Sequence, residues 1–218
     1  MFSAFEWMMA LRYLRARRQE GFISVIAWFS LLGIMLGVAT LIIVMSVMNG
    51  FRQELLTRIL GVNGHLSVYS DSEKLTNYDA LALRVQKIDG VVKVTPMIEG
   101  QVMASANGQA KGAVVRGLRR ADVQQRTILA ENIQQGSIGD LTGNNAVMLG
   151  SRMARNMGLR IGDKITLISP KGNVTAFGTV PRMKAYKVAA IFNVGMHEYD
   201  SSFIFMPLPA AQTYFKLK

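Results

Sequence analysis

The sequence predicts an α+β protein with one transmembrane helix followed by a mixed domain. Residues 22–48 carry no charge and only four polar side chains. The chain beyond that run shows strand-like and helix-like patterns in the order strand, helix, strand, strand, strand. This order is typical of an α+β sandwich, in which a helix covers an antiparallel sheet.

The apolar run at 22–48 is long enough to cross a membrane. Its 27 residues would span ~40 Å as a helix, against ~30 Å of bilayer hydrocarbon. A buried helix of a soluble domain is rarely so long and so uniformly apolar. A signal peptide has a shorter apolar region followed closely by small residues, whereas Asn49, Gly50, Phe51 and Arg52 follow here. We therefore expect a retained transmembrane helix.

The segments that flank the span predict its orientation. Residues 1–21 place apolar residues at helical spacing and end in a cluster of arginines, which indicates an amphipathic helix in the cytoplasmic interface. Positive residues near a span tend to stay cytoplasmic, so we expect the N-terminus inside and the chain from residue 50 outside. Apolar periodicity continues through 47–61, which predicts a stalk helix that ends in the glycines at 61 and 64.

Small residues recur every three or four positions along the span and form one face. Such a face lets the backbone of another helix approach closely, so we expect partner helices from elsewhere. The residues of this helix-packing face are Ala27, Ser30, Gly33, Gly37 and Thr40.

The domain at 62–218 contains several predicted strands and helices. The strands are predicted at 65–70, 91–95, 101–106, 113–117, 164–169, 186–192 and 202–206, and the helices at 78–88, 122–135 and 151–158. Residues 169–182 contain two prolines, two glycines and three apolar residues with little sequence nearby to bury them. We interpret this stretch as a long hairpin-like loop with a function.

The composition excludes several classes of function. The net charge is +11, but the basic residues are scattered, and the loose groups at 116–120 and 152–160 hold no aromatic residues that could stack on bases. We interpret these groups as solvated surface and expect no nucleic-acid binding. No phosphate loop, nucleophile elbow or paired catalytic base is present, and the group at 197–200 lacks the converging ligands of a metal site. We expect no catalytic residues, metal or cofactor.

Four stretches together resemble the LolC/LolE family of lipoprotein-releasing ABC transporter permeases. They are ALRYLRARRQEGFISVIAWFSLLGIMLGVATLIIVMSVMNGF at 10–51, LGSRMARNMGLRIGDKITLISPKG at 149–172, VPRMK at 180–184 and GMHEYDSSFIFMPLPAAQTYF at 195–215. The resemblance implies an inner-membrane permease with four spans, of which this chain would be the N-terminal portion. It also implies a MacB-like periplasmic domain, with a porter subdomain at about 62–118 and 202–218 and a sabre subdomain at about 119–201.

The resemblance further implies a mechanical role without catalysis. A LolD-like ATPase dimer would bind ATP, and a second LolC/LolE-type permease would complete the membrane part. The stalk would transmit the motion of the ATPase, so that an acylated lipoprotein moves to a LolA-type carrier. The loop at 169–182 corresponds to a hook that binds the carrier. The hook residues are Pro170, Gly172, Val174, Phe177, Gly178, Val180, Pro181 and Arg182.

Several alternatives stay open at this point. Within the LolC/LolE family, the subunit could bind the carrier as LolC does, take the LolE role on the lipoprotein side, or be a single permease type that serves both. A MacB-like or FtsX-like permease in efflux or cell-wall regulation would share the span and domain but lack the extended hook. A single-pass periplasmic adaptor would need no partner for its helix face.

Overall fold

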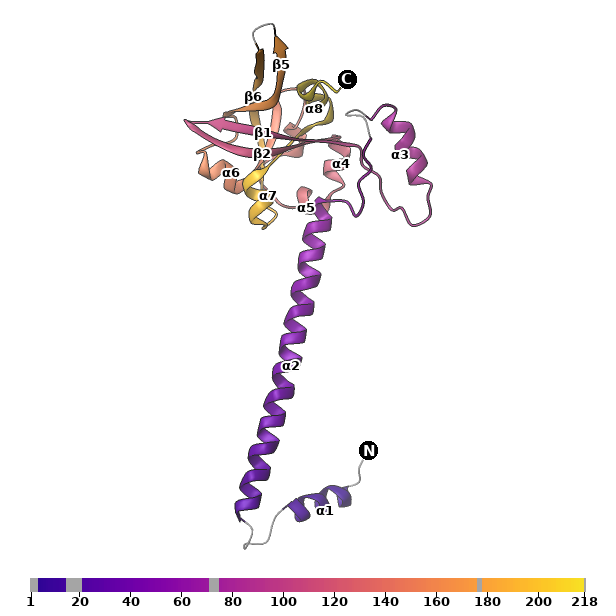
Figure 1. The fold of residues 1–218 in the computed structure, drawn as a ribbon, viewed down its shortest axis with the longest axis vertical. Coiled ribbons are helices and arrows are strands. Elements are labelled where there is room, and N and C mark those ends of the chain that lie inside the picture. Colours follow the sequence, from indigo (N-terminus) through magenta and orange to yellow (C-terminus); the bar gives the residue numbers. More distant parts are fainter. Residues whose placement is uncertain (1–3, 15–20, 71–74, 176–177, 218) are drawn as a thin grey trace. The chain divides into compact units, whose positions relative to one another are not determined.

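The computed structural model describes residues 4–14, 21–70, 75–175 and 178–217 (Figure 1). The chain divides into two compact units, Met1–Leu56 and Thr57–Lys218.

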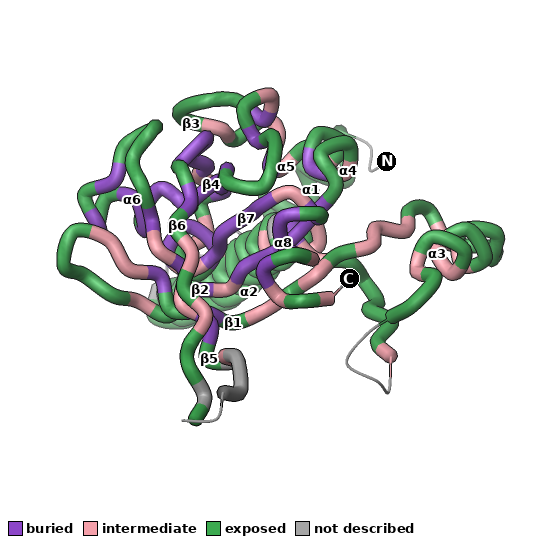
Figure 2. The backbone as a smooth tube through the Cα atoms, turned by 90° about the horizontal axis from the view of Figure 1, so that it is seen from above, coloured by how far each residue is buried: buried purple, intermediate pink, exposed green. Residues whose placement is uncertain are grey.

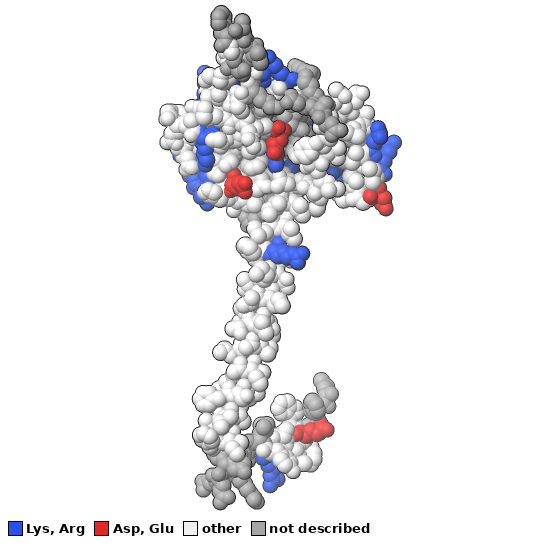
Figure 3. Space-filling model, in the orientation of Figure 1, with Lys and Arg blue, Asp and Glu red and all other residues white. Residues whose placement is uncertain are grey.

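The first unit is helical. It contains α1 (Ala4–Leu14) and most of α2 (Gly21–Val62). Among the described residues, one helix, Phe22–Val62, has the length and apolar character of a membrane span, and none of its most apolar part is buried. Figure 3 shows the uncharged part of this helix in white. The predicted continuation of the helix past Gly50 to residue 61 is confirmed.

Within its described residues, the second unit contains six further α-helices, a short 3-10 helix and seven strands. The helices are α3 (Tyr78–Gln86), α4 (Arg120–Gln124), α5 (Thr127–Ala130), η1 (Ile138–Asp140), α6 (Ser151–Asn156), α7 (His197–Ser202) and α8 (Leu208–Phe215). The strands are β1 (Met97–Ala106), β2 (Gln109–Leu118), β3 (Ile133–Gly136), β4 (Ala146–Gly150), β5 (Lys164–Thr175), β6 (Gly178–Phe192) and β7 (Phe203–Pro207).

The strands form one sheet in which six members close into a ring. Their order is β3-β6-β4-β7-β2-β1-β5, and β5 also pairs with β6. The pairs β2–β7 and β4–β6 are parallel and the other neighbours antiparallel. The first half of β6 pairs with β5 up to Lys187, and its second half pairs with β4 and β3. Closure leaves few strand edges without a partner.

Two apolar clusters lie on the two sides of this sheet. Val115, Leu149 and Tyr186 belong to the first, and Leu118, Met148 and Phe192 to the second. All five residues of β4 are buried, as the purple tube in Figure 2 shows. Helix α3 lies to one side of the sheet in both views and has no buried residue (Figures 1 and 2).

Several predicted elements are confirmed and others are wrong. The helices at 78–88 and 151–158 and the strands at 101–106, 113–117, 164–169, 186–192 and 202–206 are present with shifted bounds. The predicted strands at 65–70 and 91–95 are not strands, and Leu66 and Val92 are more than 90% exposed. Among the described residues no strand pairs with either segment, and the Gln86 side chain instead bonds the Val92 carbonyl and the Val94 amide.

The predicted helix at 122–135 is also wrong. The stretch instead forms α4, α5 and β3, since Val123 and Leu129 insert into the core and Ile133–Gly136 pairs with β6. Strand pairing has overridden local helix propensity here. The predicted porter and sabre divisions stay a prediction, and strands from both share the one ring.

Candidate functional site: the β5–β6 ribbon

The predicted loop at 169–182 is a two-stranded ribbon. Strands β5 and β6 stay paired from Lys164–Lys187 to Ser169–Arg182, and again from Asn173–Val180 to Thr175–Gly178. The ribbon extends away from the ring in Figure 1. The expectation of a loop is therefore corrected. Each side of this segment has the other as a partner strand, so the two sides continue the hydrogen-bonded ladder of β5 and β6.

An irregularity interrupts the ribbon where its prolines lie. Between the two paired stretches, Pro170 to Gly172 on β5 face the single residue Pro181 on β6. Proline cannot donate to a ladder and is confined to edges and bulges, so the prolines explain where the register shifts. Gly178 has a φ of +118°, a conformation that favours glycine at the return of the chain.

The apolar hook residues that the structure describes are accessible. Pro170, Val180 and Pro181 are exposed, Val180 by 56%. Gly172 is half-buried and Gly178 exposed. The backbone of Val174 pairs with Thr179, whereas its side chain and all of Phe177 lie outside the described residues.

Arg182 differs from the other predicted hook residues because its side chain is hydrogen-bonded to the rest of the domain. Its guanidinium is half-buried and donates a hydrogen bond to the Tyr214 carbonyl at the end of α8. Burial raises the pKa of the Tyr214 hydroxyl to about 12, although the Arg182 charge opposes this shift. Arg182 therefore anchors the base of the ribbon.

An apolar groove of about 710 Å³ lies at the base of the ribbon. Pro170, Pro181 and Ile168 form its ribbon side, and Glu198 of α7 contributes a carboxylate. Ser169 of β5 and Ser202 of α7 also line the groove. Strands β1, β2 and β7 supply the rest of the lining, namely Gln101, Val102, Met103, Gly112, Ala113, Val114 and Phe203.

A second feature, which the sequence did not predict, is the hydrogen-bonded end of α2. The Arg116 guanidinium is buried and contacts Glu99 at 2.6 Å, Asn63 at 2.8 Å and the Val62 carbonyl at 3.3 Å. Arg126 donates to the same carbonyl. Burial, and then the nearby Arg116 charge, lower the pKa of Arg126. Both arginines thus bond the carbonyl of Val62, the last residue of α2, where a helix leaves its carbonyls without intrahelical partners.

The interpretation of Arg116 as solvated surface is therefore wrong. Its guanidinium lies 4.7 Å from the centre of the Phe203 ring, and its neighbours Val115 and Gly117 are buried. The sequence carries one signal for this role, because Arg116 lies inside a predicted apolar strand. A charged residue at such a position is seldom buried unless it is paired.

The helix-packing face lies on α2 with all five residues accessible within the described residues. The Thr40 hydroxyl donates to the Leu36 and Gly37 carbonyls at 2.7 and 2.9 Å, so its hydrogen bonding is satisfied inside the helix. A Cβ added at Gly33 or Gly37 would meet nothing within 4 Å.

The acidic group at 197–200 has a structural use. Asp200 is buried, and its two carboxylate oxygens accept hydrogen bonds from the amides of Val194 at 2.9 Å and Gly195 at 3.1 Å. Burial raises the pKa of Asp200, although these two bonds oppose the shift. Within the described ranges, no three His, Asp or Glu residues lie together as metal ligands.

A family model describes what this domain is. Residues 27–218 match the MacB-like periplasmic core domain, so the chain belongs to the family that carries this domain. The expected resemblance to LolC and LolE is confirmed by curated relatives over nearly the whole chain.

The relatives cover this chain well but are themselves longer. LolC of Neisseria meningitidis is 33% identical over 218 residues, which is 100% of this chain and 52% of that protein. LolC of Xylella fastidiosa (strain Temecula1) is 33% identical over 92% of this chain and 48% of its own length. LolE of Haemophilus influenzae is 27% identical over 93% and 50%. The chain spans about half the length of these lipoprotein-releasing system transmembrane proteins.

Proposed function

We propose that this chain is part of a permease subunit of an ABC transporter that releases acylated lipoproteins from the inner membrane to a LolA-type carrier. The observation that carries the proposal is the similarity, along the whole chain, to lipoprotein-releasing system transmembrane proteins. The membrane-length helix found among the described residues and the MacB-like domain support it.

The proposal includes partners and an orientation. A separate LolD-like ATPase dimer binds ATP, a second LolC/LolE-type permease completes the membrane part, and this chain does no covalent chemistry. The N-terminus is cytoplasmic and the domain periplasmic, because arginines cluster before the span. The helix of 47–61 transmits the motion of the ATPase, and the contacts of Arg116 and Arg126 to Val62 fasten its end.

The ribbon is the proposed carrier-binding hook. Exposed Val180, Pro170 and Pro181 offer an apolar surface that continues into the groove at the ribbon base. A two-stranded ribbon with a proline bulge is more ordered than a loop, so less conformational entropy is lost when a partner binds. Phe177 is part of the proposal on the resemblance alone.

The test measures binding of a LolA-type carrier to the full chain in a nonionic detergent. We expect Val180→Asp and Pro181→Asp each to weaken binding about tenfold or more, because a charge would be buried in an apolar interface. Phe177→Asp and replacement of 172–180 by a Gly-Ser linker should abolish binding.

Val92→Asp is the matched control, since Val92 is 93% exposed and lies in a different segment. It should leave binding unchanged. Carrier binding that survives the linker replacement would overturn the hook assignment. If the intact chain binds no carrier but does bind an acylated lipoprotein, the subunit takes the LolE role. If it binds neither, the MacB-like or FtsX-like alternative is favoured.

A further inference from the structure

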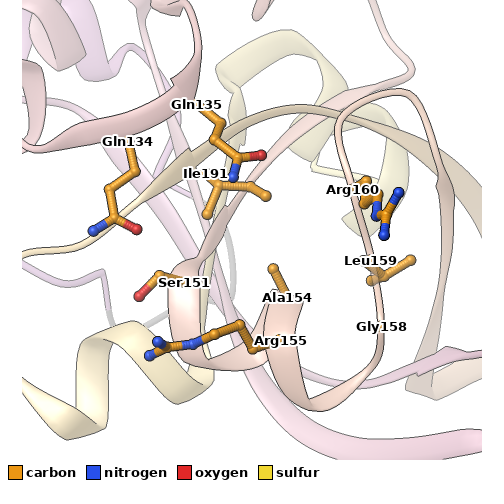
Figure 4. Close-up of a pocket in the computed structure, with 9 residues that line it drawn as sticks. All are labelled: Gln134, Gln135, Ser151, Ala154, Arg155, Gly158, Leu159, Arg160 and Ile191. Carbon is orange, nitrogen blue, oxygen red and sulfur yellow. The ribbon is translucent and has the colours of Figure 1, made fainter.

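A pocket beside α6 contains several hydrogen-bond donors in its lining. It measures about 350 Å³ and lies between α6, the turn that follows it and strand β3 (Figure 4). The register between β3 and β6 shifts around Gln134, so Gln134 is displaced from the regular pairing. Its lining residues are Gln134, Gln135, Ser151, Ala154, Arg155, Gly158, Leu159, Arg160 and Ile191.

Within the described residues, the charged and hydroxyl side chains of this pocket make no hydrogen bond to the protein. Arg155 and Arg160 are exposed, and neither guanidinium forms an ion pair within 4 Å with a described residue. Ser151 is only 4% exposed, and its hydroxyl has no partner in the part of the chain that the structure describes. Figure 4 shows this hydroxyl on the same side of the pocket as the Gln134 and Arg155 side chains. A buried hydroxyl without a partner is costly unless something occupies the site.

The acids nearest to these arginines are already engaged. Asp200 interacts electrostatically with Arg155 and with Arg152, but its carboxylate accepts the two backbone amides described above. Asp163 accepts a hydrogen bond from the backbone amide of Arg160 at 2.8 Å. Among the described residues, no carboxylate lines the pocket itself. Figure 4 shows the Arg155 guanidinium, the Ser151 hydroxyl and the Gln134 amide at one end of the pocket, with Arg160 at the opposite end. The first end therefore presents one cation, a hydroxyl and an amide to whatever enters.

We propose that this pocket binds the oxyanion group, carboxylate or phosphate, of a small molecule. Guanidinium groups bind both oxyanions through paired hydrogen bonds, and the Ser151 hydroxyl supplies the donor that the anion would satisfy. The volume is in the range of small-ligand pockets. This site is separate from the hook and goes beyond the proposed function.

The test titrates the full chain in a nonionic detergent with inorganic phosphate and, separately, with succinate by calorimetry. We expect saturable binding of at least one probe that matched sodium chloride does not reproduce. Arg155→Gln should weaken this binding by about tenfold or more, through the loss of a charge-assisted hydrogen bond. Arg152→Gln is the matched control, because Arg152 is exposed on the same helix but does not line the pocket.

Ser151→Ala separates a binding role from a structural one. Without ligand it should leave the unfolding midpoint unchanged or raise it, because it removes a buried hydroxyl without a partner, yet it should weaken binding several-fold. Absence of binding by either probe would overturn the proposal, as would equal losses in Arg152→Gln and Arg155→Gln. Binding of phosphate alone, or of succinate alone, would support it and identify the oxyanion.

Discussion

At the scale of single residues, Arg116 shows how one buried charge can hold two distant segments together. Its guanidinium reaches Glu99 on β1 and Val62 and Asn63 at the end of α2, and it faces the Phe203 ring. The amide of Asn63 in turn donates to the Tyr199 hydroxyl. A planar group with five donors suits this geometry, whereas a lysine ammonium could not reach all the acceptors at once.

We expect Arg116→Met to lower the free energy of unfolding by about 2–4 kcal/mol. The change leaves the Val62 carbonyl and Asn63 without this donor, and the loss is below that of a fully buried ion pair because Glu99 is 44% exposed. The free energy of unfolding of Arg116→Lys should lie between those of the unchanged protein and of Arg116→Met. Urea unfolding of the full chain, followed by circular dichroism, measures both, with exposed Arg120→Met as control. A loss equal to that of the control would mean that Arg116 is not structurally important.

At the scale of elements, the sequence predicts those whose pattern is local. The alternation at 101–106 follows from the one buried face of β1, and the turn at Asn107–Gly108 closes the hairpin to β2 with positive φ at both residues. Strand β2 becomes buried on both faces from Val115 to Leu118. Strand β4 was missed because it is buried on both faces and shows no alternation. The prolines and apolar residues of 169–182 indicate a distinct segment there, but the pairing of β5 with β6 depends on a partner strand that a local pattern does not reveal.

The contact between β4 and α7 also depends on non-local packing. A Cβ added at Gly150 would lie 2.2 Å from the Asp200 carbonyl oxygen and 2.5 Å from its carbon. Both are backbone atoms, which cannot move aside as a flexible side chain can. Because Gly150 has a φ of −67°, this glycine is required by the close approach and not by its backbone conformation.

We expect Gly150→Ala to destabilise the domain by about 1–3 kcal/mol or more, through overpacking. Gly112→Ala, on β2, is the matched control, because a Cβ there meets nothing within 4 Å, and it should be neutral or slightly stabilising. The unfolding midpoints of the two variants in urea provide the comparison. Similar stability for both would show that β4 and α7 can separate without cost.

At the scale of the whole molecule, the membrane span is the part that composition determines most directly. A long uncharged run needs no tertiary information, since the bilayer and not the fold decides its conformation. The anion pocket is the opposite case, because Gln134, Ser151 and Arg160 are brought together only by the sheet and its bulge. The helix-packing face lies between these cases. Its spacing is local, but the partner that we expect for it is a helix from elsewhere.

This partner leads to the last prediction. The chain has no cysteine, so a single introduced thiol can carry a photocrosslinker in membranes that contain the assembled transporter. We expect adducts from Ser30→Cys on the small-residue face, and none from Met35→Cys, which lies about 200° around the helix from Gly33. Adding Gly33→Ile and Gly37→Ile to Ser30→Cys should abolish the adducts, because larger side chains prevent close approach of the backbones. The urea midpoint of the domain should not change, since both glycines face open space. Equal adducts from both positions, or adducts that survive the double isoleucine change, would mean that the small-residue face does not pack against another helix.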